Sequence, residues 1–312
     1  MRASARRRRL LEQHHRRDAQ HLEQLAEQKQ GAAVTTPESH DQTVRSTDGT
    51  RLVVRRTGTG DPVVLVHGSG GGLHSWATVA DQLAKEHEVW LPARRGYGPS
   101  EVPAGIKSFE DDVADLTAVI QTAGGASDRP VHLIGASYGA TVALHTAVAS
   151  PGRLRSLALF EPPLFAAGPR IAPLLDRYRV AFAHNDQPAM AATLNEVTQV
   201  PAEVVAALAA AMGDRTPDPV EAKRSALGWL HDLEALAEDD PEIGRWSAVG
   251  APTLLLQGAD TWEPMPTTMD ALAAALPRVR RIIWQGQSHF VTHTAPDLVA
   301  DALRQFFAEI PA

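Results

Sequence analysis

The chain has 312 residues, of which 44% are hydrophobic and 21% charged, and its formal net charge is −7 at pH 7. These values are ordinary for a soluble globular protein, and the absence of cysteine excludes disulfides and cysteine-based zinc sites. No stretch approaches the roughly 20 apolar residues of a membrane span, and no apolar run follows the arginine-rich start as in a secretory signal. We therefore expect a cytoplasmic protein.

Residues 1–42 differ in composition from the rest of the chain. Residues 1–30 carry eight Arg or Lys and four Asp or Glu, and four leucines recur among them at approximate helical spacing. So few apolar residues predict a disordered or loosely helical basic extension. Attachment to an anionic surface or nucleic acid through Arg6–Arg9, and helix-mediated association, are the alternatives.

From residue 43 onward, predicted strands and helices alternate. Strands are expected at 43–47, 51–57, 63–66, 89–93, 131–135, 154–160, 253–257 and 279–284. Asp48-Gly49 is a hairpin signal between the first two strands, whereas helices such as 109–122 between later strands require parallel crossovers. The pattern predicts an α/β fold with a mostly parallel eight-stranded sheet and helices on both faces.

The strand signal disappears between Pro163 and Val249. Helices are expected there near 172–183, 189–196, 202–212 and 220–236. An insertion between the sixth and seventh strands lies over the carboxyl edge of the sheet, where ligands bind in α/β folds. We therefore expect a core made of 43–162 and 250–312, and a helical cap over 163–249 that shapes a substrate pocket.

Residues 135–139 read Gly-Ala-Ser-Tyr-Gly and match the pattern G-x-S-x-G. A predicted strand precedes this pattern and a helix-forming segment follows it. A strand that runs directly into a helix forces strained backbone at the connecting residue, and flanking glycines leave room for the turn to pack. We therefore predict that Ser137 is a nucleophile rather than a serine in an ordinary turn.

A glycine-rich loop, His67-Gly68-Ser69-Gly70-Gly71-Gly72, follows the predicted strand at 63–66. The loop matches neither the phosphate-binding pattern G-x-x-x-x-G-K-[ST] nor a dinucleotide-binding pattern. Its glycines let backbone N–H groups approach a substrate oxygen closely. We expect the N–H of Ser69, or that of Gly70, to form an oxyanion hole together with the N–H of Tyr138.

The general base that a serine nucleophile needs is expected near the carboxyl end of the chain, after the last predicted strand. The segment Gly286-Gln287-Ser288-His289 follows that strand. His289 is favoured over His293 because it follows a glycine-containing turn. Histidines in polar stretches, such as His184 and His231, are expected to be exposed.

The chain resembles the α/β-hydrolase superfamily over residues 43 to 310. The resemblance lies in the order of five motifs, at residues 67–71, 95–100 (Arg-Gly-Tyr-Gly-Pro-Ser), 135–139, 252–264 and 286–289. One departure is Ala93, where the family often has an acidic residue that is structural. The resemblance implies the capped hydrolase fold and a Ser-His-acid triad.

The acid of this implied triad has two candidates. The family usually places it after the seventh strand, where Asp260 follows Gly258 by two residues instead of three, although Pro264 stands at the family's usual distance beyond it. A turn shortened by one residue reconciles both facts. Glu161 follows the sixth strand, where some family members carry the acid. We favour Asp260 and keep Glu161 as the alternative, because either carboxylate can fix the tautomer of His289.

The resemblance implies a serine hydrolase that cleaves a carboxylic ester, or a related small acyl substrate, through an acyl-enzyme. It implies no cofactor and no metal. Lactone hydrolysis, cofactor-free haloperoxidase-like chemistry and C–C bond hydrolysis use the same triad and remain alternatives. A non-catalytic ligand-binding protein on this scaffold is a further one. Epoxide and haloalkane hydrolysis are disfavoured, because relatives that catalyse them have aspartate at the position of Ser137. Nucleic acid is not an expected partner.

Overall fold

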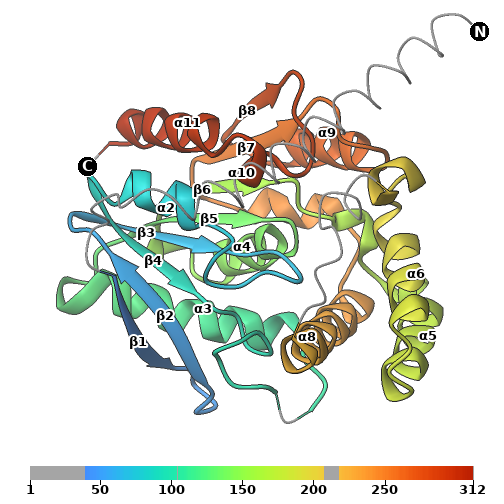
Figure 1. The fold of residues 1–312 in the computed structure, drawn as a ribbon. Coiled ribbons are helices and arrows are strands. Elements are labelled where there is room, and N and C mark those ends of the chain that lie inside the picture. The colour runs from blue at the N-terminus through green and yellow to red at the C-terminus, as the bar shows by residue number, and fades with distance from the viewer. Residues whose placement is uncertain (1–38, 104, 207–217, 312) are drawn as a thin grey trace, which may run out of the picture.

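The computed structural model describes residues 39–103, 105–206 and 218–311, which form an eight-stranded sheet with helices on both faces (Figure 1). In spatial order the strands are β1 (His40–Arg45), β2 (Arg51–Thr57), β4 (His87–Pro92), β3 (Asp61–Val66), β5 (Val131–Ala136), β6 (Leu154–Phe160), β7 (Thr253–Gly258) and β8 (Val279–Trp284). The β1–β2 and β2–β4 pairs are antiparallel, and all the other pairs are parallel. The predicted fold class is confirmed.

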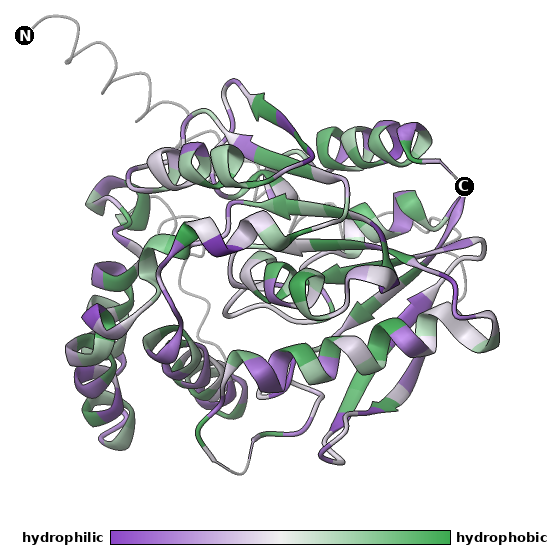
Figure 2. Ribbon diagram, turned by 180° about the vertical axis from the view of Figure 1, so that it is seen from behind, coloured by the Kyte–Doolittle hydropathy of each residue, from purple (hydrophilic) through white to green (hydrophobic). Residues whose placement is uncertain are grey.

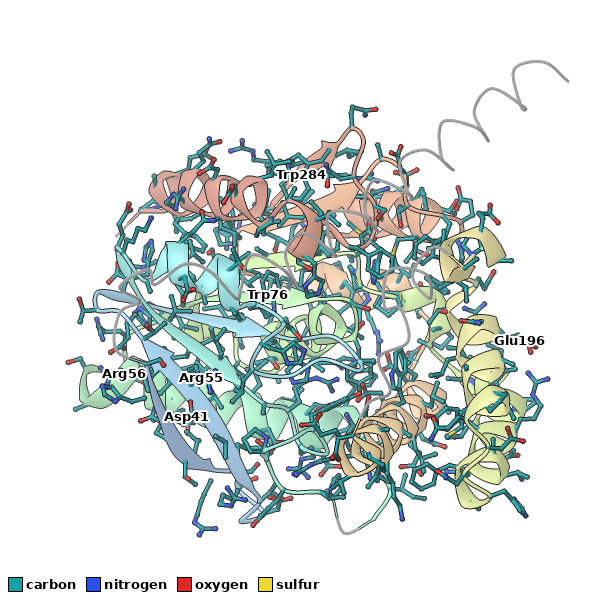
Figure 3. All side chains as sticks on the ribbon, viewed as in Figure 1. Asp41, Arg55, Arg56, Trp76, Glu196 and Trp284 are labelled. Carbon is teal, nitrogen blue, oxygen red and sulfur yellow. The ribbon has the colours of Figure 1, made fainter. Side chains whose placement is uncertain are left out.

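The first strand begins earlier than expected. β1 starts at His40, three residues before the predicted strand, so residues 40–42 belong to the sheet and not to the N-terminal extension. Asp41 lies opposite Arg55 of β2, and Arg55 Nε and Nη2 donate to the two carboxylate oxygens of Asp41 at 2.8 and 3.0 Å (Figure 3). This cross-strand ion pair gives a polar segment a place at the sheet edge. The rest of the expected extension, residues 1–38, lies outside the described residues.

Apolar side chains cover both faces of the sheet. Along β3, Val63 and Leu65 point into one core and Val64 and Val66 into the other, as the two-residue period of a strand requires. In Figure 2 the central strands are mainly green, the colour of hydrophobic residues. Parallel strands buried on both faces leave their carboxyl ends as the place for a site.

Two groups of helices cover the sheet. One core is packed against α2 (Ala77–Leu83) and α11 (Pro296–Glu309), and the short α10 (Val291–Thr294) precedes α11. The other core is packed against α3 (Phe109–Gly124), α4 (Tyr138–Ala149) and α9 (Met265–Ala275). Short 3₁₀ helices span Gly125–Ser127, Pro151–Arg153, Leu164–Ala166, Pro169–Ile171 and Ile243–Ala248.

Three described cap helices lie between β6 and β7, as predicted: α5 (Ala172–Ala183), α6 (Gln187–Thr198) and α8 (Pro219–Glu238) (Figure 1). Asp218 caps α8 by accepting from the N–H groups of Val220 and Glu221, and Pro219 suits the first helical position. Of the helix expected at 202–212, residues 202–206 are helical and the remainder lies outside the described residues. None of the described helices is long and apolar enough to cross a membrane.

Candidate active site

Ser137 connects β5 directly to α4 in a strained turn. Its φ of 53° lies in a region that non-glycine residues rarely occupy, and its N–H donates to the carbonyl of Phe160 at 2.8 Å. A Cβ at Gly135 would lie 2.3 Å from the carbonyl oxygen of Gly139, and one at Gly139 would lie 2.5 Å from that of His67. Both glycines of the pattern are therefore required for the turn to pack.

A cavity of about 480 Å³ lies above Ser137, between the carboxyl edge of the sheet and the cap. Its wall is largely aromatic and aliphatic, with contributions from Trp76, Phe160, Phe165, Trp229, Trp262 and Met265. Among the described residues that line it there is no Asp, Glu, Lys or Arg, and its polar side chains are those of histidine, serine, threonine, asparagine and tyrosine. The cavity suits an uncharged, mainly apolar group.

His289 lines the same cavity and is held by a buried carboxylate. Its Nδ1 lies 2.5 Å from Oε2 of Glu161, which is fully buried, whereas the side chain of His289 is 19% exposed. Glu161 also accepts from the N–H of Gly258 at 2.9 Å and from the hydroxyl of Thr261 at 3.2 Å. Three donors thus fix the carboxylate, and the carboxylate holds the imidazole through Nδ1.

Glu161 reaches this position because β6 and β7 are parallel neighbours that end side by side. β6 ends at Phe160, so the next residue lies beside Gly258 at the end of β7, and Glu161 adopts a φ of 44° there. The turn after β7 also packs tightly against the histidine loop, since a Cβ at Gly258 would lie 2.4 Å from the carbonyl of Gln287. The carboxyl end of the sheet thus brings together groups distant in sequence.

Asp260, the acid that the sequence favoured, lies in the turn after β7. Its backbone N–H donates to the carbonyl of Gln287 at 2.9 Å. The hydrogen bond described at Nδ1 of His289 goes to Glu161, the alternative candidate. Glu263, a nearby carboxylate, is exposed. His293 also lines the cavity, but its side chain is exposed and lies in α10.

The glycine-rich loop lies directly beside Ser137. A Cβ at Gly68 would lie 3.0 Å from the Cβ of Ser137, so a side chain there would press against that serine. His67 is buried, and burial together with the nearby Arg94 guanidinium lowers its pKa to about 3. Its neutral ring accepts from the N–H of Arg94 at 3.0 Å and donates to the carbonyl of Gly68 at 2.8 Å. His67 is therefore a structural group that shapes the loop.

The hydroxyl groups of the two predicted oxyanion residues are hydrogen-bonded to carboxylates of a buried polar cluster. The hydroxyl of Ser69 donates to Asp232 at 2.6 Å, and that of Tyr138 donates to Asp112 at 2.8 Å. Sequence reasoning missed this cluster. It also took His231 to be exposed, whereas His231 is buried and bonded to Glu234 at 2.9 Å. In the described ranges, no three His, Cys, Asp or Glu side chains gather as a metal site would need.

The fold is that of a family of hydrolases. The sequence model of the alpha/beta hydrolase family matches residues 63–302, and the chain belongs to that family. Among solved structures it resembles an alpha/beta hydrolase from Sphaerobacter thermophilus, with a TM-score of 0.69 and 28% identity over 85% of this chain and 100% of that one. A thermophilic esterase from Thermogutta terrifontis has the same fold, with a TM-score of 0.68 and 23% identity over 88% of this chain and 100% of the esterase.

Among curated relatives, the chain is similar to 2-hydroxy-6-oxo-2,4-heptadienoate hydrolase of Pseudomonas putida. The two are 40% identical over 106 residues, which are 33% of this chain and 37% of that enzyme. It is also similar to the putative carbamate hydrolase RutD of Azorhizobium caulinodans, with 26% identity over 81% of this chain and 93% of the relative. A third relative, 2-hydroxymuconate semialdehyde hydrolase of Pseudomonas sp. (strain CF600), is 34% identical over 114 residues, which are 36% of this chain and 40% of that enzyme. The chain thus covers only 37% and 40% of the length of the heptadienoate and semialdehyde hydrolases.

Proposed function

We propose that this chain is a serine hydrolase that cleaves a neutral carboxylic ester through an acyl-enzyme on Ser137. One observation carries the proposal. A serine in a strained strand-to-helix turn shares an apolar cavity with a histidine whose Nδ1 is bonded to the buried Glu161. Nucleophile, base and orienting acid in this relation define the logic of a catalytic triad.

In the proposed reaction, Nε2 of His289 takes the proton of the Ser137 hydroxyl as its oxygen attacks the ester carbonyl. The N–H groups of Ser69 and Tyr138 stabilise the oxyanion. When the tetrahedral intermediate collapses, the imidazolium gives its proton to the departing alcohol and the acyl group stays on Ser137. Water then attacks the acyl-enzyme with His289 as base, and the acid is released.

We assign the role of the orienting acid to Glu161 instead of Asp260. The carboxylate of Glu161 is bonded to Nδ1 of His289, and a carboxylate in that position keeps the proton on Nδ1, so that Nε2 can act as base. The cap helices would close the cavity over the acyl group. This division, a cap over 163–249 on a core made of the flanking segments, is part of the proposal.

The wall of the cavity supports a neutral acyl group. An ionised carboxylate that loses its hydration in an apolar cavity is costly unless a cation or several donors replace the water. The described lining offers no Lys or Arg for this purpose. The likeness to the heptadienoate hydrolase supports C–C bond hydrolysis as a second candidate on the same triad, but the name of that enzyme's substrate denotes a carboxylate.

The experiment that tests this proposal compares p-nitrophenyl valerate with p-nitrophenyl hemisuccinate, which has similar length but ends in a carboxylate. We expect the valerate to be hydrolysed with a kcat/KM at least about tenfold higher, because the anion loses hydration without a cation to receive it. A 2-hydroxy-6-oxo-dienoate is the third substrate. Preference for the hemisuccinate or the dienoate would contradict the proposal, and so would hydrolysis of the valerate by Ser137→Ala at the wild-type rate.

A further inference from the structure

Cap helix α8 lies with one face on the loop that follows β4 (Figure 1). The residues of that face, Arg224, Gly228 and Asp232, recur every four positions and so share one side of the helix. A Cβ at Gly228 would lie 2.5 Å from the ring of Tyr97, and Arg224 donates to the carbonyl of Ser100. The absence of a side chain at position 228 therefore lets the helix approach the core closely.

Asp232 enters the core from this face and is fully buried. Its carboxylate accepts from both terminal nitrogens of Arg94 at 2.9 and 2.7 Å, and from Lys107 at 2.7 Å, Tyr97 at 2.6 Å and Ser69 at 2.6 Å. Burial alone acts to raise the pKa of this carboxyl, but the two cations hold it well below its usual range. A cap residue thus carries a permanent negative charge inside the core.

A second carboxylate balances the charges of this cluster. Asp112 of α3 accepts from Lys107 and from the hydroxyl of Tyr138, each at 2.8 Å, and lies 3.8 Å from Arg94. Two cations and two carboxylates are therefore buried together, and the net charge of the four is zero. Buried charges persist in a protein when they are paired and hydrogen-bonded in this way.

Residues of this buried cluster contact each of residues 67–70 in the glycine-rich loop, which we call the oxyanion loop because it contains Ser69. Arg94 Nε donates to the carbonyl of His67 at 3.0 Å, and Arg94 Nη2 to that of Gly68 at 3.4 Å. The hydroxyl of Tyr97 accepts from the N–H of Gly70 at 3.2 Å. Ser69 lies between Gly68 and Gly70 in the loop, and its hydroxyl donates directly to Asp232. The loop is thus held through two carbonyl groups, the Ser69 hydroxyl and the Gly70 N–H, and none of these described contacts uses the N–H of Ser69.

We propose that Asp232 is a positioning residue through which the cap sets the geometry of the oxyanion hole: it holds the hydroxyl of Ser69 and orients Arg94 and Tyr97 on the same loop. The proposal rests on the proposed acyl transfer, because only that chemistry uses the N–H of Ser69. In this proposal the cap both lines the pocket and positions the loop that contains Ser69. When α8 is seated, its carboxylate completes the support of the loop that stabilises the transition state.

The test compares Asp232→Asn with Asp239→Asn. Asp239 ends the same helix and is likewise buried and paired with both terminal nitrogens of an arginine, Arg245, but its described partners are outside the oxyanion loop. For each variant, kcat and KM are measured on p-nitrophenyl valerate. The inhibition constant of a trifluoromethyl ketone of the same chain length is also measured, because its adduct with a serine places an oxyanion in the hole.

We expect Asp232→Asn to lower kcat by about 10- to 100-fold and to weaken the ketone by a similar factor, since losing one direct oxyanion donor costs about 10²- to 10³-fold. Its KM should stay within about threefold, because KM reflects the apolar cavity. Asp239→Asn should leave all three quantities within about threefold of wild type. Equal losses in both aspartate variants would mean a general effect on folding and would overturn the positioning role.

Ser69→Ala tests the same proposal without changing the charge of the cluster. The same three quantities are measured on it, and it replaces Asp232→Asn if that variant does not fold. It keeps the backbone N–H and removes only the hydroxyl that Asp232 holds, so kcat and ketone affinity should fall together, and Ser69→Thr should restore part of both. A kcat and a ketone affinity equal to wild type in Ser69→Ala would overturn the positioning role of Asp232 but not the proposed function. A wild-type chain that neither hydrolyses the ester nor binds the ketone would overturn the proposed function as well.

Discussion

Glu161 and Asp232 are both fully buried carboxylates, but their surroundings differ in charge. The described partners of Glu161 are a backbone N–H, a hydroxyl and the imidazole of His289. Asp232 instead faces two permanent cations, Arg94 and Lys107, as well as two hydroxyls. One carboxylate belongs to the core at the end of β6, and the other belongs to the cap.

In the proposed mechanism, this difference separates a carboxylate that faces a transient charge from one that faces permanent charges. A carboxylate that stabilises an imidazolium during the reaction is most effective when no fixed cation has already neutralised it. A carboxylate that holds a loop in place needs such cations, because an unpaired buried charge is destabilising. Glu161 fits the first requirement and Asp232 the second. Neither carboxylate lines the cavity, so in the proposed mechanism each acts on the substrate indirectly, Glu161 through His289 and Asp232 through the glycine-rich loop.

The largest expected effect concerns Ser137, the proposed nucleophile. Ser137→Ala should lower kcat by about 10⁴- to 10⁶-fold, because the triad acts as a unit and the other members cannot replace the nucleophile. The substitution removes one hydroxyl, so circular dichroism and thermal unfolding should match wild type. Turnover within about tenfold of wild type in a purified sample would show that the chemistry does not pass through Ser137.

The next effect separates the two candidate acids. Glu161→Gln keeps the size of the side chain but no longer holds the productive tautomer of His289, and kcat/KM should fall by about 10²- to 10⁴-fold. Asp260→Asn is the matched control and should cost less than about tenfold. The two values are measured on one activated ester. The reverse order would return the role to Asp260, and large losses in both would indicate a shared network.

The two buried carboxylates should also differ in their effect on stability. Asp232→Asn leaves two buried cations facing one carboxylate, and breaking such a pair costs about 3–5 kcal/mol of the free energy of unfolding. Glu161→Gln removes no ion pair with a permanent cation and should cost less than about 2 kcal/mol. Urea unfolding of both variants gives the comparison. Equal losses would mean that the two sites do not differ in their electrostatic role.

The smallest effect concerns buried groups that carry no charge. Burial, together with His87 and Arg155, lowers the pKa of His132 to about 4. From about pH 6.5 to about 4, the unfolded chain binds a proton that the folded chain excludes, so stability falls as the pH falls, by up to about 1.4 kcal/mol per pH unit. His67 adds to the same slope. Carboxylates with lowered pKa values, such as Asp232, lose their contribution only below this window.

Urea unfolding between pH 7 and pH 5 checks this prediction. His132→Asn should flatten the dependence of the unfolding free energy on pH by about 1 kcal/mol per unit, because the amide replaces the ring nitrogen that lies 2.7 Å from the hydroxyl of Ser156 without taking up a proton. His184→Gln, at an exposed position, is the control and should keep the wild-type slope. An unchanged slope in His132→Asn would mean that the imidazole titrates alike in both states.

The sequence predicted the fold well because its signals are local. Alternating strands and helices, the Asp48-Gly49 turn and the loss of strand signal after Pro163 each depend on neighbouring residues, and the observed sheet and cap helices agree with them. The start of β1 was missed because residues 40–42 are polar. They belong to the sheet through pairing with β2 and the ion pair between Asp41 and Arg55, which no local pattern reveals.

In the candidate site, too, features with a local sequence signal were predicted, and features that depend on distant residues were not. The strained turn at Ser137 and the loop before His289 are local patterns, and both residues line one cavity. The choice between Glu161 and Asp260 was not local, since it depends on which strand end faces the imidazole. The pairing of Arg94 with Asp232 joins residues 138 positions apart, and nothing in the polar stretch around Asp232 distinguishes a buried helix face from an exposed one.

The measurement that tests the central claim most directly is covalent labelling with a fluorophosphonate, followed by mass spectrometry of the labelled peptide. The account predicts one adduct, on Ser137, that forms in step with the loss of ester hydrolysis and is absent from Ser137→Ala. It also predicts slower labelling of Glu161→Gln, because the histidine must activate the hydroxyl. An adduct on another residue that abolishes activity, or undiminished activity after complete labelling of Ser137, would contradict the account.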